Sequence, residues 1–216
     1  MRKNQSFSNP IIRHVQEYSS IYSFIIVLFL MGVVFGAVIV NSLSFDQKDD
    51  LYYYLNQFFG QVSDGKVAAP SDLFRLSFLH NVKFLGLMWI LGISIIGLPI
   101  ILILLFIKGI VVGFSVGFLV NQMGWGGFLL SFVTVLPQNF FIIPMFIFIA
   151  VMAVGVSLKL IRKIFIKQNI GFHIFPMLAQ YVIAFVFAVG IISLAAGVEA
   201  YLSPTLMKSV MSYVNK

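Results

Sequence analysis

The chain has 216 residues, of which 60% are hydrophobic and only 10% are charged, and its mean hydropathy is +1.02. Soluble domains are about 45–50% apolar and about 25% charged, so this composition excludes an ordinary soluble protein and indicates a polytopic membrane protein. Cysteine is absent, which excludes a disulfide framework and a thiolate metal site. The net charge of +7 comes from basic residues at the ends of apolar runs, a pattern typical of topology signals and not of a nucleic-acid surface.

The chain opens with a polar segment, residues 1–18, which we expect to be cytoplasmic. Its basic residues are Arg2, Lys3 and Arg13. The apolar run 19–40 follows and predicts the first membrane-spanning helix. Gly32 and Gly36 lie one helical turn apart within it. Such a pair either lets a neighbouring helix approach closely or reflects the general frequency of glycine in membrane helices.

Residues 41–77 form the only sizeable polar segment, which we expect to be an external loop. Five of the seven acidic residues lie here: Asp46, Asp49, Asp50, Asp64 and Asp72. Apolar residues at helical spacing predict an amphipathic helix at the membrane surface: Leu51, Tyr52, Leu55, Phe58 and Phe59. This helix either seals the bundle or docks a partner. The candidate partner-binding residues are Asp46, Asp49, Asp50, Tyr52, Tyr53 and Phe58.

The next apolar stretch, from Leu73 to Phe106, is too long for one ordinary crossing. A split at Gly97-Leu98-Pro99 gives two spans of about 22 residues each, and proline suits the first turn of a helix. The second of these spans, 98–122, contains a row of glycines at a four-residue step: Gly109, Gly113 and Gly117. The row predicts close packing against another helix.

Lys108 lies near the middle of that span. A lysine at this depth costs about 2.5–3.5 kcal/mol on insertion scales, so it is expected to face protein or water. It could belong to an ion or solute path. The interpretation we favour is that Lys108 donates to backbone carbonyls freed at a break near Pro137.

The fourth span, 128–157, is interrupted by Pro137-Gln138-Asn139 and by Pro144 after a glycine-rich turn at 124–127. Each proline removes an intrahelical hydrogen bond, so a half-helix over 128–135 and a second part over 139–158 are expected. The full set of predicted packing residues is Gly32, Gly36, Lys108, Gly109, Gly113, Gly117, Pro137, Gln138, Asn139 and Pro144.

A last span, 174–200, and a short external tail, 201–216, complete a single integral membrane domain, 1–216. The fold class is therefore all-α: a helical bundle of about five transmembrane helices. Five crossings put the basic cluster Lys159, Arg162, Lys163 and Lys167 on the same, cytoplasmic side as the N-terminus, as the positive-inside rule requires. The cluster is also expected to attract anionic membrane lipid.

Three stretches carry a resemblance to a known family: 78–83 at the start of the second span, Lys108-Gly109 with Gly113, and 136–139 followed by Pro144. The chain resembles the stage II sporulation protein M family, and the resemblance covers essentially its whole length. The family typically has Asn, His, Gly and Glu where this chain has Lys108, Gln138, Asn139 and Ile142. Gln138 and Asn139 can hydrogen-bond but cannot titrate, so any proton-transfer or metal role of the family residues is lost here.

The resemblance implies a non-enzymatic scaffold for septal peptidoglycan remodelling during forespore engulfment, in the mother-cell septal membrane. It also implies two partners, the peptidoglycan-degrading stage II sporulation proteins D and P. The residues alone predict no catalytic site, metal or cofactor, since His14, His80 and His173 lie at different places along the bundle. Glu199 could pair with Lys83 or Arg75.

A small transporter or channel using Lys108 and the Pro137 break is the alternative, and it requires a water-lined cavity near Lys108 and Gln138. The glycine rows also permit a homo-oligomer.

Overall fold

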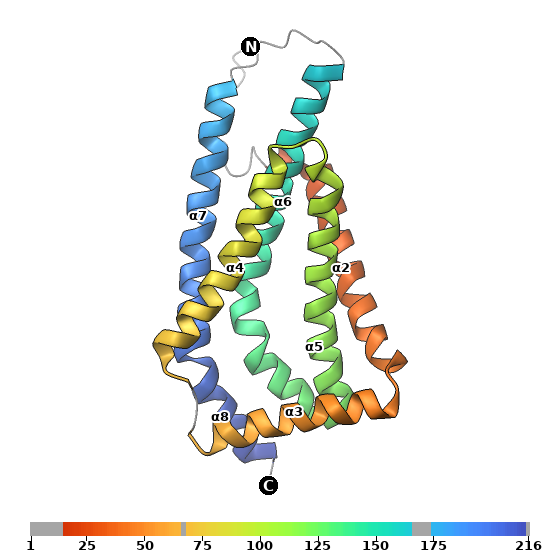
Figure 1. Cartoon of the computed structure of the whole chain (residues 1–216), viewed down its shortest axis with the longest axis vertical. Helices are drawn as coiled ribbons and strands as arrows, with labels where there is room; N and C mark the ends of the chain where they lie inside the picture. The colour runs from red at the N-terminus through yellow and green to blue at the C-terminus, as the bar shows by residue number, and fades with distance from the viewer. Residues whose placement is uncertain (1–14, 66–67, 166–173, 215–216) are drawn as a thin grey trace, which may run out of the picture.

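The computed structural model describes residues 15–65, 68–165 and 174–214, and within them it is a bundle of long helices closed at one end by a helix that crosses it (Figure 1). Parts of the predicted basic signals lie outside the described residues: Arg2, Lys3, Arg13 and Lys167. The helices are α2 (Ser19–Ser42), α3 (Phe45–Ser63), α4 (Pro70–Gly92), α5 (Gly97–Thr134), α6 (Leu136–Phe165), α7 (Ile174–Tyr201) and α8 (Ser203–Val214). The predicted all-α membrane bundle is confirmed.

Four stretches of the described chain are long and apolar enough to cross a membrane: Ser19–Ser42, Gly97–Thr134, Leu136–Arg162 and Phe175–Met207. The predicted second span, α4, is not among them, because Arg75, His80 and Lys83 reduce its apolar character. It nevertheless runs alongside α6 and α7 in the bundle (Figure 1). The split between α4 and α5 falls at residues 93–96, directly before the predicted Gly97-Leu98-Pro99, and Pro99 lies in the first turn of α5.

Figure 1 shows α2 beside α5, α4 beside α7, and α6 between these pairs. The core is built from apolar side chains of all five long helices, and α6 is its axis: Ile149, Ala150, Val151 and Ala153 are all fully buried. Residues 153–157 of the same helix are buried at five consecutive positions. Five such positions cover every side of a helix at about 100° per residue, so neighbours surround α6 here.

The chain reverses direction at Gly124, whose φ of 55° and ψ of −127° interrupt α5. This left-handed conformation favours glycine. A Cβ on Gly127 would overlap the carbonyl oxygen of Leu119, so the short helix after the turn lies directly on the end of the preceding one. The predicted turn and half-helix are both present. The break before α6 lies at Val135, and α6 then continues through Pro144, where a second interruption was predicted.

The predicted polar tail is instead helix α8. Met207 is buried and Val210 half-buried against a small apolar cluster formed by Phe59 and Val62 of α3 with Leu119 and Leu130 of α5. Thus α8 fastens α3 across the end of the bundle (Figure 1). The turn between α4 and α5 lies at the opposite end.

Candidate functional site

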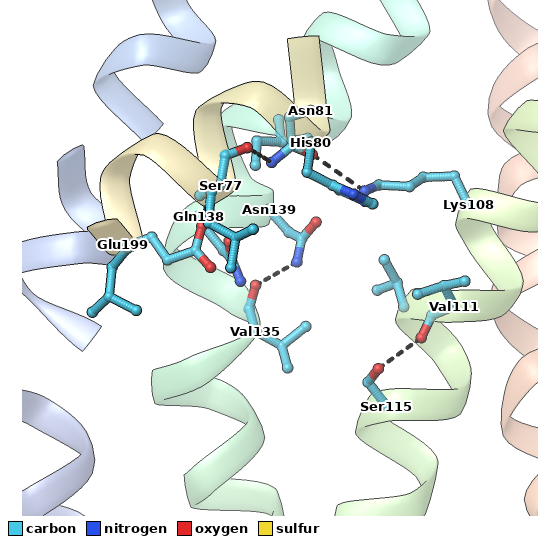
Figure 2. A pocket seen from close by; sticks show the side chains of 14 residues that line it. Ser77, His80, Asn81, Lys108, Val111, Ser115, Val135, Gln138, Asn139 and Glu199 are labelled. Atoms are coloured by element: carbon cyan, nitrogen blue, oxygen red, sulfur yellow. Dashed lines mark hydrogen bonds between the residues drawn. The ribbon is translucent and has the colours of Figure 1, made fainter. Parts of the chain in front are cut away.

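A cavity of about 430 Å³ lies between α4, α5, α6 and α7 (Figure 2). Its polar lining residues are Ser77, His80 and Asn81 from α4, Lys108 and Ser115 from α5, Gln138 and Asn139 from α6, and Glu199 from α7. Leu73, Leu76, Val111, Val112, Val135 and Ile142 complete the wall. The cavity therefore contains the intramembrane lysine, the polar pair after Pro137 and an acidic residue from a fourth helix.

Lys108 is held from one side by an amide and from another by aromatic rings. Its Nζ donates to Asn81 Oδ1 at 3.3 Å and lies 5.2 Å from the ring centroid of Phe146 and 5.7 Å from that of Phe84. Asn81 is buried, and its Nδ2 donates to Ser77 O at 3.0 Å, so its oxygen is turned toward the lysine. A desolvated cation gains from both kinds of contact.

The favoured interpretation, that Lys108 donates to carbonyls freed at the Pro137 break, is wrong. Lys108 donates to Asn81 instead, and at the break the side-chain Nδ2 of Asn139 donates to Val135 O at 2.7 Å, one helical turn back. Pro137 lies in the first turn of α6, where a missing backbone N–H leaves no bond unmade. Lys108 is consequently available to the cavity.

Glu199 accepts hydrogen bonds from two other helices. Ser77 Oγ donates to its Oε2. Of the two orientations of the Gln138 amide, the one that places nitrogen toward Glu199 lets Nε2 donate to Oε1 at 3.0 Å; in the other, Nε2 donates to Thr134 O at 3.3 Å. The hydrogen-bonding needs of the carboxylate select the first orientation.

The predicted pairing of Glu199 with Lys83 or Arg75 is also wrong. Both basic residues are exposed, whereas Ser77 is buried on the face of α4 that meets α7. Two residues along a helix correspond to a rotation of about 200°, so Arg75 and Ser77 point in nearly opposite directions. The acidic residue therefore belongs to the cavity and not to the outer surface.

The two charges of the cavity do not touch. Within the described residues, no carboxylate lies inside the 4.0 Å ion-pair distance of Lys108. Figure 2 shows Lys108 and Glu199 pointing into the cavity from opposite sides. Each charge is thus held by neutral groups and faces the same open volume.

A second cavity of about 450 Å³ adjoins the first, and Leu73, Val135, Gln138 and Glu199 line both. Its other walls come from α3 and α8, including Phe58, Gln61 and Met207. Toward the α4–α5 turn the first cavity ends at a core layer in which Leu85, Ile101 and Leu105 are fully buried. The polar volume is therefore connected toward the α3 end and closed toward the other end.

Among the described residues, the polar groups of the cavity form neither a metal site nor a nucleophile relay. Across the part of the chain that the structure describes, no group of three His, Asp or Glu residues could hold a metal ion. Ser77 donates directly to Glu199, with no imidazole between them. A nucleophile relay needs a base in that intermediate position.

The glycine row of α5 lies against α2. A Cβ on Gly113 would overlap the carbonyl oxygen of Val33, and one on Gly36 would overlap that of Ile110. Gly32 and Gly109 are equally close to the opposite backbone, while Gly117 has slightly more room, with Ala37 Cα 3.0 Å from a built Cβ. We refer to this contact of α2 and α5 as the glycine seam.

The predicted partner-binding residues do not all lie on the exposed face of α3. Asp46, Asp49, Asp50 and Tyr53 are exposed and fall within an arc of about 100° on the helix, opposite the buried Phe59 and Val62. Tyr52 is half-buried and Phe58 is 48% exposed, so these two lie on the flanks of the arc. Sequence reasoning missed Phe45 and Tyr54, which are 87% and 68% exposed.

The comparisons with known proteins give one match. A family model described as stage II sporulation protein M matches residues 25–204 of the chain. No curated protein and no solved structure matches significantly. The matched range includes α3, the glycine seam and every residue that lines the cavity.

Proposed function

The chain belongs to the stage II sporulation protein M family, a family of sporulation-related membrane proteins, and on that premise we propose that it is a non-enzymatic scaffold. It recruits and anchors cell-wall hydrolases at the septal membrane while septal peptidoglycan is remodelled during engulfment. Its proposed partners are stage II sporulation proteins D and P. The observation that supports this proposal most is the acidic, aromatic display on α3.

The display is fixed at both ends. Ser44 and Gln47 form a reciprocal capping box, with Ser44 N donating to Gln47 Oε1 at 3.0 Å and Gln47 N donating to Ser44 Oγ at 3.3 Å. At the other end, Phe59 and Val62 pack against α5 and α8. A helix that is already ordered loses less entropy when a partner binds.

The chemistry of the display indicates its partner. Three carboxylates flanking an exposed Tyr53 suit a basic surface with an apolar groove, since aromatic residues dominate binding hot spots and opposite charges steer association. A helix that only sealed the bundle would not need exposed aromatic rings beside its acids. This favours docking over sealing, the two interpretations of the external helix.

The test is co-purification of the hydrolases with a variant in which Asp46, Asp49 and Asp50 are all changed to Lys. We expect the amount of bound partner to fall about tenfold or more, because the charges that attract it are reversed. The amount of protein in the membrane should not change, because all three side chains are exposed. Glu17→Lys, an exposed charge reversal at the opposite end of α2, is the control and should retain the partner. Unchanged recovery with the triple variant would refute the docking surface.

The proposal also requires α3 to lie outside the cell. Because the chain has no cysteine, single cysteines can report its sidedness. Asp50→Cys should react with a membrane-impermeant maleimide in intact cells, and Arg162→Cys should react only after lysis. The reverse labelling pattern would place α3 in the cytoplasm, away from peptidoglycan, and would refute the proposal.

A transporter is the second candidate, because a cavity does lie at Lys108 and Gln138, as transport requires. Its closure by Leu85, Ile101 and Leu105 favours a binding site over a conduit. Proteoliposomes distinguish the two. Transport predicts solute flux that Lys108→Met abolishes, whereas a scaffold predicts no flux with either form.

A further inference from the structure

The cavity holds one positive and one negative charge that neutral groups keep apart. Asn81 accepts from Lys108, while Ser77 and Gln138 donate to Glu199. A ligand with a single charge would leave the second charge of the cavity unmatched. A ligand bearing an anionic and a cationic group would complement both, and a desolvated charge gains most from an oppositely charged hydrogen-bonding partner.

The cavity opens sideways, between α4 and α5. Leu76 of α4 and Val111 of α5 line it and are 72% and 53% exposed, and His80 beside them is exposed as well. Figure 1 shows α4 and α5 diverging from their turn toward the α3 end. Helix α5 is long and apolar enough to span a bilayer, so its exposed Val111 faces lipid on this flank. A lipid can therefore reach the cavity without crossing the core.

We propose that this cavity binds the head group of a phospholipid that carries both a phosphate and a primary ammonium. The phosphate lies at Lys108, and the ammonium donates to Glu199 from the opposite side. The acyl chains remain outside, along Leu76 and Val111. This site is independent of the scaffold function, since none of its residues belongs to the α3 display.

The two functional groups of the head group are specified by the two ends of the cavity. A lysine ammonium supplies up to three donors, of which Asn81 takes one, so phosphate oxygens can accept the others. A carboxylate accepts only, so it distinguishes a primary ammonium, which donates, from a quaternary one, which cannot. Phosphatidylethanolamine is thus favoured over phosphatidylcholine and over phosphatidylglycerol.

The experiment measures lipid binding to the purified full-length protein by native mass spectrometry and by thermal unfolding in detergent. Short-chain phosphatidylethanolamine, phosphatidylcholine and phosphatidylglycerol are titrated in parallel, together with soluble phosphoethanolamine. We expect phosphatidylethanolamine to bind about tenfold more tightly than the other two lipids and to raise the unfolding temperature. Equal responses to all three lipids would overturn the proposal.

Soluble phosphoethanolamine distinguishes the source of the head group. Weaker binding of the soluble compound supports a lipid that enters from the membrane, because the acyl chains then contribute to affinity. Binding as tight as that of the lipid would overturn the lipid source and identify a soluble zwitterion as the ligand.

Two variants test the charges separately. Lys108→Met should lower affinity for phosphatidylethanolamine and phosphatidylglycerol alike, since both carry the phosphate. Glu199→Gln keeps an acceptor for Ser77 and should abolish only the preference for ethanolamine over choline. Because this second change is nearly isosteric, it remains informative if Lys108→Met fails to fold.

The matched control is Ser115→Ala. Ser115 lines the same cavity, but its hydroxyl donates to Val111 O at 2.9 Å within its own helix. It should leave lipid binding and selectivity unchanged. If Ser115→Ala lowered selectivity as much as Glu199→Gln, cavity shape and not charge would determine binding, and the proposal would fail.

Discussion

The two faces of helix α5 differ in how closely they pack against their neighbours. On one face Gly109 and Gly113 bring its backbone against α2, leaving no room for a single added carbon. On the other, Lys108 and Val112 border about 430 Å³ of open volume. Lipid provides no hydrophobic force between helices, so close van der Waals contact holds the seam together, whereas the cavity face gives up such contact. The difference separates residues that build the fold from residues available for binding.

The largest effect is expected at the seam. Gly113→Leu would push the side chain into the backbone of Val33 and force α2 and α5 apart, at a cost of about 3 kcal/mol or more. We expect little folded protein in the membrane and a lower unfolding temperature in detergent. Gly190→Leu is the control, because a Cβ at Gly190 meets nothing within 4 Å. Equal levels of the two variants would show that the seam does not hold the fold.

An intermediate effect is expected at Glu199, which links α7 to α4 and α6 by hydrogen bonds at the cavity. Glu199→Leu removes the acceptor of Ser77, which costs about 1–3 kcal/mol, whereas Gln138 can turn its amide to donate to Thr134 O. The thermal unfolding midpoint should fall, and Glu199→Gln should recover most of the loss. If Glu199→Gln were as unstable as Glu199→Leu, the negative charge itself would be required for folding.

The smallest effect is expected at Lys108. Lys108→Met keeps a long side chain for Phe84 and Phe146 and removes the cost of holding a charge out of water, so stability should change by no more than about 1 kcal/mol in either direction. The measurement is again thermal unfolding in detergent. A loss as large as that of Gly113→Leu would erase the distinction between the two faces.

Sequence periodicity predicted the long helices and most of their ends, because apolar length, glycine and proline act locally. The reversal at Gly124 and the α4–α5 turn are both set by residues at the turn itself. The helix α8 was missed because its twelve residues are too short to cross a membrane, although Leu206, Met207, Val210 and Val214 recur at helical spacing. Its buried Met207 is evident only once α3 lies beside it.

A cavity near Lys108 and Gln138 was expected only under the transporter alternative, and its other polar residues could not be predicted, because the rotation of each helix about its own axis depends on its neighbours. Glu199 could pair along the outside or point inward, and only the packing of α4 against α7 decides between Arg75 and Ser77. A partial signal was present. Ser77 and Asn81 are one turn apart on α4 and thus mark a polar face that must meet something other than lipid.

The fastening of α3 by α8 has a consequence for the order of biogenesis. Helix α8 follows all the other described helices in the chain, whereas α3, which it holds, is the second of them. A chain interrupted after α7 would already contain the whole bundle, yet its acidic helix would lack Met207 and Val210 to rest on. Only molecules in which α8 has been synthesised would present a rigid surface, so a chain that stops before α8 is expected to dock a partner poorly.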